Sequence, residues 1–247
     1  HASGMLASKL LDEKQVVIFK HNDHKNLDEK INSTIVKGRK IIAIEGVYSM
    51  GGDLAAKEIF DIAQKQNALL IVDEAHSSGV LGENLLGIFS HYKIKPQKNH
   101  IKMGTLGKAY GSYGAYILAS NEIIEFLLNR AKAVIYTTAP SLFDIALGHE
   151  ALNFILKNTD FLKNRINSNL QVINDILGIN SDSLIIPIEI ADNKKVIEIQ
   201  TQLKEKGYLV GAIRQPTVKS AIIRLIAKID ISTDELAKVC RLIKELK

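Results

Sequence analysis

Two predicted strands that lead to polar residues constrain the fold of this chain more than any other feature. Ala68–Val72 is a continuous apolar run followed directly by Asp73, and Ile101–Thr105 is a second predicted strand that leads to Lys108. Continuous apolar runs of this length are typical of strands in a parallel sheet, because such strands are buried on both faces. Residues that follow the carboxyl ends of parallel strands gather at one edge of the sheet, where ligands bind. We therefore expect Asp73 and Lys108 to lie in one site.

The rest of the sequence alternates strand and helix patterns and predicts an α/β fold, with a mainly parallel sheet flanked by helices. Further strands are expected at Gln15–Lys20, Ile41–Val47, Gly114–Ala119, Val134–Thr138, Leu184–Ile190, Tyr208–Ile213 and Ala221–Ile229. Helices are expected at Met5–Leu11, Leu27–Ile31, Leu54–Asn67, Asn121–Lys132, Ser141–Leu177 (one or two helices), Lys194–Lys206 and from Ser232 onward. Because the pattern changes near Gly178, we expect a large domain over residues 1–177 and a smaller α+β domain over residues 178–247.

An aspartate and a lysine placed in this way suit the chemistry of pyridoxal phosphate. A lysine amine forms a Schiff base with the aldehyde of this cofactor, and an aspartate keeps the pyridine nitrogen protonated so that the ring accepts electrons from a carbanion. Neither residue is specific by itself, since Asp-Glu often ends a strand and a lysine in a loop is usually solvated. Together with His76, which follows Asp73 by three residues, they predict a pyridoxal phosphate site.

Composition argues against several other classes of protein. The formal net charge of +5 comes from lysines dispersed through predicted helices, without the concentrated basic stripe of a nucleic-acid site. A single cysteine, Cys240, excludes an intramolecular disulfide and a cysteine-rich metal site, and we expect a buried thiol there. The sequence has no apolar run of about 18–20 residues, which a membrane span needs, and shows no secretory leader. A cytoplasmic protein without a membrane partner is expected.

Four segments resemble the α-oxoamine synthase family of fold-type-I pyridoxal phosphate enzymes, and the resemblance covers essentially all 247 residues. They are EGVYSMGGD (residues 45–53), VDEAHSSG (72–79), TLGKAYGSYGAY (105–116) and VGAIRQPTV (210–218). The family joins an amino acid to an acyl thioester with loss of carbon dioxide. The VGAIRQPTV segment is most similar to members that condense L-alanine with a pimeloyl thioester, carried by coenzyme A or acyl carrier protein, to 8-amino-7-oxononanoate in biotin biosynthesis.

The resemblance therefore implies a pyridoxal phosphate-dependent C-acyltransferase. Two alternatives stay open. One is an activity like that of glycine C-acetyltransferase or 5-aminolevulinate synthase. The other is a non-catalytic scaffold subunit of the same fold, although such a subunit would have no need of a Schiff-base lysine.

Matched to the family position by position, six residues or residue pairs lie on the cofactor side of the site. Lys108 matches the Schiff-base lysine, Asp73 the partner of the pyridine nitrogen, and His76 the residue that hydrogen-bonds the phenolic oxygen of the ring. Ser49 matches a serine at the cofactor and Thr105 a contact to its phosphate. Thr138, or its neighbour Thr137, matches a residue that reaches the phosphate of the other subunit, which implies a homodimer.

On the substrate side, the resemblance implies that His1 stacks over the cofactor ring and that Thr217 contacts the substrate. Arg214 is expected to bind a carboxylate, because its planar guanidinium suits bidentate contacts, with Arg224 as the alternative. Gln215 and Lys219 depart from the prolines that are common at these positions. The chain opens His-Ala-Ser-Gly without an initiator methionine. We therefore expect that the family's N-terminal part, with its glycine-containing phosphate loop, is missing.

Overall fold

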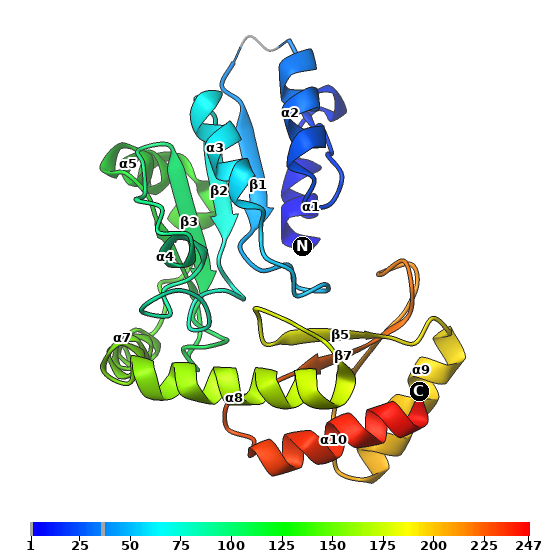
Figure 1. Ribbon diagram of the computed structural model, residues 1–247. Coiled ribbons are helices and arrows are strands. Elements are labelled where there is room, and N and C mark those ends of the chain that lie inside the picture. Colours follow the sequence, from blue (N-terminus) through cyan, green and yellow to red (C-terminus); the bar gives the residue numbers. More distant parts are fainter. Residues whose placement is uncertain (1, 36–37) are drawn as a thin grey trace. The chain divides into compact units, whose positions relative to one another are not determined.

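The computed structural model describes residues 2–35 and 38–247, and it divides into two compact units (Figure 1). The first unit contains the residues up to Val47 together with Leu54–Phe154. The second contains Tyr48–Asp53 and Ile155–Lys247. Each unit has a sheet of its own. The predicted domain boundary near Gly178 stays a prediction.

The first unit is built on a four-stranded sheet in the order β1-β2-β3-β4. Its strands are β1 (Ile41–Glu45), β2 (Leu69–Asp73), β3 (His100–Thr105) and β4 (Ala115–Leu118). The first three run parallel, and β4 runs antiparallel to β3. The register pairs Asp73 with Met103, so that β2 and β3 end side by side. The predicted mainly parallel sheet is confirmed.

The connection between β1 and β2 is a helix, as parallel strands require. This helix, α3 (Lys57–Lys65), is cyan in Figure 1 and buries Ile59, Phe60, Ile62 and Ala63 at helical spacing. The ring of Phe60 packs edge-on against Phe89 and Tyr92, with centroids 5.3 and 6.1 Å away. Burial of each such side chain stabilises the fold by roughly 1.5–3 kcal/mol. These apolar contacts thus stabilise the sheet, whose parallel strands are followed at their carboxyl ends by the predicted site residues.

The remaining helices of the first unit lie outside the sheet. They are α1 (Ala2–Ser8), a 3₁₀ turn at Glu13–Gln15, α2 (His24–Ser33), α4 (Ile88–His91), α5 (Asn121–Arg130), α6 (Lys132–Ile135) and most of α7 (Leu142–Lys157).

Two strand predictions in this unit are wrong. Gln15–Lys20 forms no strand, and Val17 and Ile18 are exposed; Lys20 instead donates its amide to Asn26 Oδ1 at the start of α2. Most of Val134–Thr138 lies in or beside the single turn of α6, with exposed side chains. In both segments β-branched residues favour a strand, but strand propensity takes effect only where a neighbouring strand offers pairing and burial.

The second unit packs three helices on a three-stranded antiparallel sheet in the order β5-β7-β6. The strands are β5 (Ile185–Glu189), β6 (Gly211–Ile213) and β7 (Ile222–Ile226). The helices are α8 (Thr159–Leu177), α9 (Asn193–Glu205) and α10 (Thr233–Leu246). Their apolar faces form one core, which includes Ile173, Ile186, Ile199, Leu203, Ile223, Leu236 and Ile243.

Polar contacts fix the ends of these helices. Ser232 accepts a hydrogen bond from the amide of Glu235 and so caps α10, as the sequence predicts. The guanidinium of Arg165 on α8 donates to the carbonyl oxygens of Ile229 and Ile231 at 3.0 and 2.8 Å.

Cys240 is buried in the core, and burial raises the pKa of its thiol to about 11. Within residues 2–35 and 38–247, the search for a helix both long and apolar enough to span a membrane finds none.

His100, at the start of β3, should make the stability of the chain depend on pH. Its ring is buried against Phe89, and Nδ1 accepts a hydrogen bond from the amide of Gln97 at 3.1 Å. Burial lowers the pKa of His100 below its usual 6.5, so just below that pH the unfolded chain takes up a proton that the folded chain refuses. The stabilising contribution is therefore complete above pH 6.5 and is lost as the pH falls through the lowered pKa.

We expect His100→Gln to lose less free energy of unfolding than the wild type when the pH falls from about 7.5 to about 5.5. Glutamine keeps an acceptor for the amide of Gln97 but does not titrate. Urea unfolding of both proteins at the two pH values measures the difference. Equal losses in the two proteins would show that His100 carries none of the acid sensitivity.

Candidate functional site

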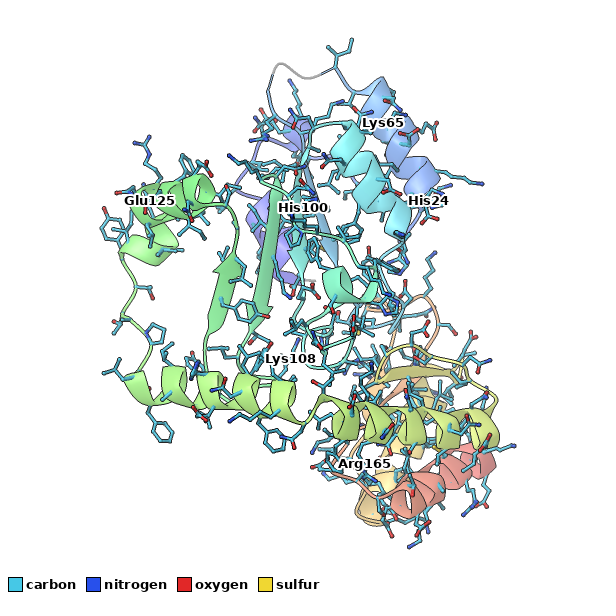
Figure 2. All side chains as sticks on the ribbon, turned by 60° about the vertical axis from the view of Figure 1, so that its left-hand side comes forward. His24, Lys65, His100, Lys108, Glu125 and Arg165 are labelled. Carbon is cyan, nitrogen blue, oxygen red and sulfur yellow. The ribbon has the colours of Figure 1, made fainter. Side chains whose placement is uncertain are left out.

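Lys108 and His76 meet at the carboxyl edge of the first sheet. Lys108 stands in the turn that follows β3 and is labelled in Figure 2. The amide of Gly111 donates to the carbonyl of Lys108 at 3.0 Å and closes this turn. The amine nitrogen Nζ lies 2.8 Å from Nε2 of His76. If Lys108 is an ammonium it donates this hydrogen bond, and the imidazole then carries its proton on Nδ1.

Asp73 is the last residue of β2, and its backbone joins the two neighbouring strands. Its carbonyl accepts from the amide of Gly46 at 2.7 Å, and the next residue, Glu74, donates its amide to Met103 on β3 at 2.7 Å. The half-buried carboxylate accepts a hydrogen bond from the amide of Ala75 at 2.9 Å. This bond fixes one carboxylate oxygen and leaves the group able to bind a second donor.

Thr105 ends β3 and shapes the turn that carries Lys108. Its hydroxyl donates to the carbonyl of Gly114 at 3.2 Å and accepts from the amide of Gly107 at 3.1 Å. A hydroxyl beside backbone amides is the kind of surface that binds a phosphate. Lys108, His76, Asp73 and Thr105 are thus four of the predicted residues, and the first unit places all of them at the carboxyl ends of β2 and β3.

The turn that carries His76 is fixed by residues that sequence reasoning missed. The amides of Ser77 and Ser78 both donate to the carbonyl of Glu74. The buried hydroxyl of Ser78 lies 2.9 Å from the phenolic oxygen of Tyr116 on β4. Gly104 pairs with Tyr116 across the strands, and a Cβ there would lie 2.4 Å from the phenol, so only glycine leaves room. In the sequence, the only sign of this packing was a glycine, Gly104, in a strand next to one that contains Tyr116.

The predicted residues of the second unit form a separate group. The carbonyl of Ser49 accepts a hydrogen bond from Nε of Arg224 at 2.7 Å, and partial burial lowers the pKa of Arg224. Arg214 and Thr217 are exposed in the turn after β6, where the amide of Thr217 donates to the carbonyl of Arg214 at 3.0 Å. Of the two arginines, Arg224 therefore has the better-ordered surroundings.

One predicted residue belongs to neither group. Thr138 is exposed in the segment between α6 and α7, within the first unit. His1 lies outside the described residues.

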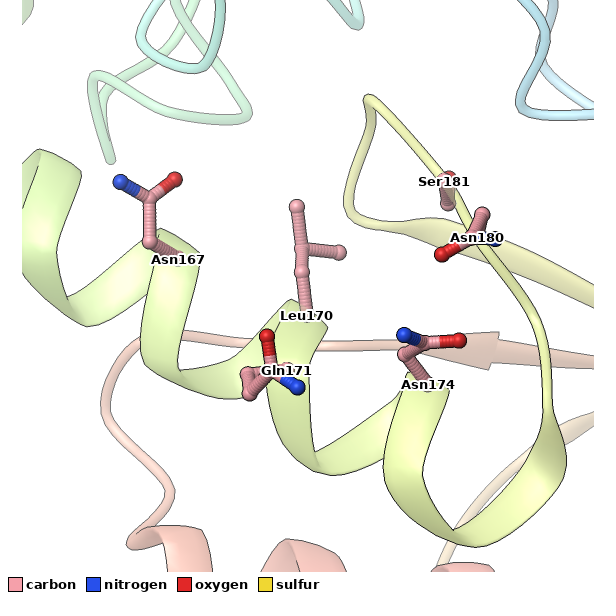
Figure 3. Close-up of a pocket in the computed structure, with 6 residues that line it drawn as sticks. All are labelled: Asn167, Leu170, Gln171, Asn174, Asn180 and Ser181. Carbon is pink, nitrogen blue, oxygen red and sulfur yellow. The ribbon is translucent and has the colours of Figure 1, made fainter.

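A hollow on the second unit contains none of the predicted residues. Its volume is about 260 Å³, and Figure 3 shows its lining from α8 and the loop that follows. The lining residues are Asn167, Leu170, Gln171, Asn174, Asn180 and Ser181. It has no charged or nucleophilic group suited to the predicted chemistry. The residues that the structure describes hold no cluster of three or more histidine, cysteine or acidic side chains able to bind a metal ion.

The sequence pattern of the family described as aminotransferase class I and II matches residues 11–243. The chain belongs to this family. An 8-amino-7-oxononanoate synthase of Helicobacter pylori strain J99 is 45% identical over 226 residues, which are 91% of this chain and 60% of that protein. The chain spans about 60% of the length of the curated Helicobacter relatives that it matches.

Solved structures of family members agree with this fold. The 8-amino-7-oxononanoate synthase of Francisella tularensis has a TM-score of 0.74 at 28% identity, covering 92% of this chain and 67% of that one. A lysine-to-alanine variant of a serine palmitoyltransferase from S. paucimobilis, with a bound PLP–myriocin aldimine, has a TM-score of 0.84 at 22% identity, covering 92% of this chain and 60% of that one. At that identity the likeness shows the fold alone. The predicted resemblance to α-oxoamine synthases and the fold-type-I transferase fold are confirmed.

Tyr116→Phe tests whether the phenol fixes the turn that carries His76. The substitution leaves the buried Ser78 hydroxyl without its partner, and partial burial raises the pKa of the Tyr116 phenol. We expect the free energy of unfolding to fall by roughly 1–3 kcal/mol. Chemical denaturation measures the loss, and Tyr113→Phe, an exposed position, is the control. Equal stability of the two variants would contradict the role assigned to Tyr116.

Proposed function

We propose that the protein is a pyridoxal phosphate-dependent C-acyltransferase. It condenses L-alanine with a pimeloyl thioester, of coenzyme A or acyl carrier protein, to give 8-amino-7-oxononanoate, carbon dioxide and the free thiol carrier in biotin biosynthesis. The observation that carries the proposal is the contact between Lys108 and His76, 2.8 Å apart at the carboxyl edge of the parallel sheet. The substrates rest on the Helicobacter relative, whose name states this product at 45% identity.

The residues at this edge fit pyridoxal phosphate. The Lys108 amine is exposed, and Asp73 directly follows a buried strand position, with one carboxylate oxygen fixed by a backbone amide. The Thr105 hydroxyl stands beside the amide of Gly107, as a phosphate contact requires. An amine, a carboxylate and a phosphate-binding turn on two adjacent strands are the donor set that this cofactor needs. We assign Lys108, Asp73, His76 and Thr105 to hold it, and Ser49 and Thr138 as further contacts.

When bound, pyridoxal phosphate supplies an aldehyde for the amine and a protonated ring that accepts electrons from the α-carbon of the amino acid. Asp73 would hold the proton on the ring nitrogen. His76 would donate a hydrogen bond to the phenolic oxygen and orient the acyl group. Lys108 would remove the α-proton of alanine through Nζ, because an amine held 2.8 Å from an imidazole has a fixed direction. Lys108, His76 and Asp73 are therefore the catalytic residues of the proposal.

We assign the substrate carboxylate to Arg214, with Thr217 beside it and His1 over the cofactor ring. The order around Arg224, whose Nε is bonded to the carbonyl of Ser49, makes it the alternative clamp.

A homodimer with the site at the subunit interface is part of the proposal. The segment that contains Thr138 carries many exposed large apolar side chains, among them Val134, Ile135, Tyr136, Leu142 and Phe143. Apolar surface of this kind marks interaction sites on soluble proteins. We place the reaction in the cytoplasm, where acyl thioesters of coenzyme A and acyl carrier protein are used.

A substrate screen with the protein expressed from its complete coding sequence tests this function. We expect product from L-alanine with pimeloyl thioester, and little from glycine with acetyl or succinyl thioester. Lys108→Ala should lower turnover by roughly a hundredfold or more, because the proton-transferring amine is lost, while the circular dichroism spectrum stays unchanged. Mass spectrometry of the aminoketone product measures both effects.

Other outcomes would redirect the assignment. Preference for glycine with a short acyl group would replace the substrates by those of glycine C-acetyltransferase or 5-aminolevulinate synthase. Full turnover in Lys108→Ala would overturn the catalytic scheme. Failure of the folded wild type with every substrate pair would favour a non-catalytic subunit.

A further inference from the structure

Glu74 is the one carboxylate among the described residues whose side chain is fully buried, and it stands between Asp73 and His76 in the chain. Its oxygen Oε2 accepts hydrogen bonds from the hydroxyl of Ser77 and, at 2.8 Å, from the amide of Ile88. The other oxygen, Oε1, lies 3.6 Å from Nζ of Lys102. A buried carboxylate costs several kcal/mol unless donors and a cation offset it. Here both are present.

The pair formed by Glu74 and Lys102 joins the two strands that carry the site. Lys102 is paired with Val72 in the parallel register, and β3 leads from it to Thr105 and Lys108. Its ammonium also donates a short hydrogen bond to the carbonyl of Leu86. The Glu74 side chain thus connects the segment after β2, the strand β3 and the loop before α4.

The backbone at Gly87 packs directly against the Glu74 carboxylate. Gly87 has a φ of +102°, and a Cβ there would lie 2.2 Å from Oε2 of Glu74. Gly87 precedes Ile88, whose amide binds the same oxygen. Because the surrounding chain fits the carboxylate so closely, Glu74 cannot shift without moving the loop.

His76 is held between two buried anchors. Glu74 is the first, and Ser78, bonded to Tyr116, is the second. The imidazole lies between them on a turn that the Glu74 carbonyl closes, and its Nε2 faces Lys108. The position of His76 therefore depends on groups that touch neither the substrate nor the cofactor.

We infer that Glu74 is a positioning residue: through Lys102, Ser77 and the amide of Ile88 it holds His76 against Lys108. The inference rests on the proposed function only where it assigns His76 and Lys108 to the cofactor. Glu74 has no catalytic contact. It holds the segment after β2, which contains Asp73 and His76, in place beside the segment after β3, which contains Lys108.

The test follows the ring signals of His76 by NMR in the 247-residue chain without cofactor. His76→Asn identifies these signals, and Lys108→Met shows where they lie when the partner amine is absent. Glu74→Gln keeps the shape and an acceptor but removes the charge, and Lys102→Met removes the cation. We expect both to move the His76 signals toward their positions in Lys108→Met. The double variant should move them no further than the larger single change, because one pair is being broken.

Ile59→Val is the matched control, since Ile59 is a buried apolar residue of α3. It should lower the melting temperature yet leave the His76 signals in place. Ser77→Ala, which removes one donor to Glu74, replaces Glu74→Gln if that variant does not fold. His76 signals that stay at the wild-type positions in the folded Glu74 or Ser77 variant would overturn the inference, as would an equal shift in Ile59→Val.

Binding of pyridoxal phosphate by the wild type is measured separately. If the protein expressed from its complete coding sequence does not bind the cofactor, the proposed function fails. The His76 comparison still decides the role of Glu74, because it uses no cofactor.

Discussion

The parallel register between β2 and β3 is the interaction on which the candidate site depends. It pairs Asp73 with Met103, so the chain leaves both strands at the same edge, with β3 running two residues further to Thr105. A shift of one residue would turn every side chain of a strand to the opposite face. Lys102 would then face away from Glu74. The chemistry proposed at Lys108 is therefore a consequence of apolar strands that pair in one way.

Buried polar groups make this register hold beyond the ends of the strands. The Glu74 amide extends the β2–β3 ladder by one bond, and its side chain reaches Lys102 on β3. The Ser78 hydroxyl reaches Tyr116 on β4. Breaking a hydrogen bond between buried polar groups costs more stability than breaking one at the surface, because the remaining group cannot bond to water instead. The turn that carries His76 is therefore half-buried at its tip and held at its base by buried contacts.

The sequence predicted the parts of this arrangement that follow from local pattern. The apolar run before Asp73 and the strand predicted before Lys108 became parallel strands, and the capping signal at Ser232 marked the start of α10. Gln15–Lys20 and Val134–Thr138 had a strand composition but no neighbour with which to pair. The contacts of Glu74 with Ile88 and of Ser78 with Tyr116 could not be predicted, because they join residues 14 and 38 positions apart and leave no periodic signal.

The central claim is that Lys108 is the amine that binds pyridoxal phosphate at this sheet edge. Borohydride reduction of the protein with added pyridoxal phosphate, followed by peptide mass mapping, tests it most directly. The account predicts a phosphopyridoxyl group on Lys108 and on no other lysine at equal yield. A folded, full-length protein with no adduct, or with the adduct on another lysine, would contradict it.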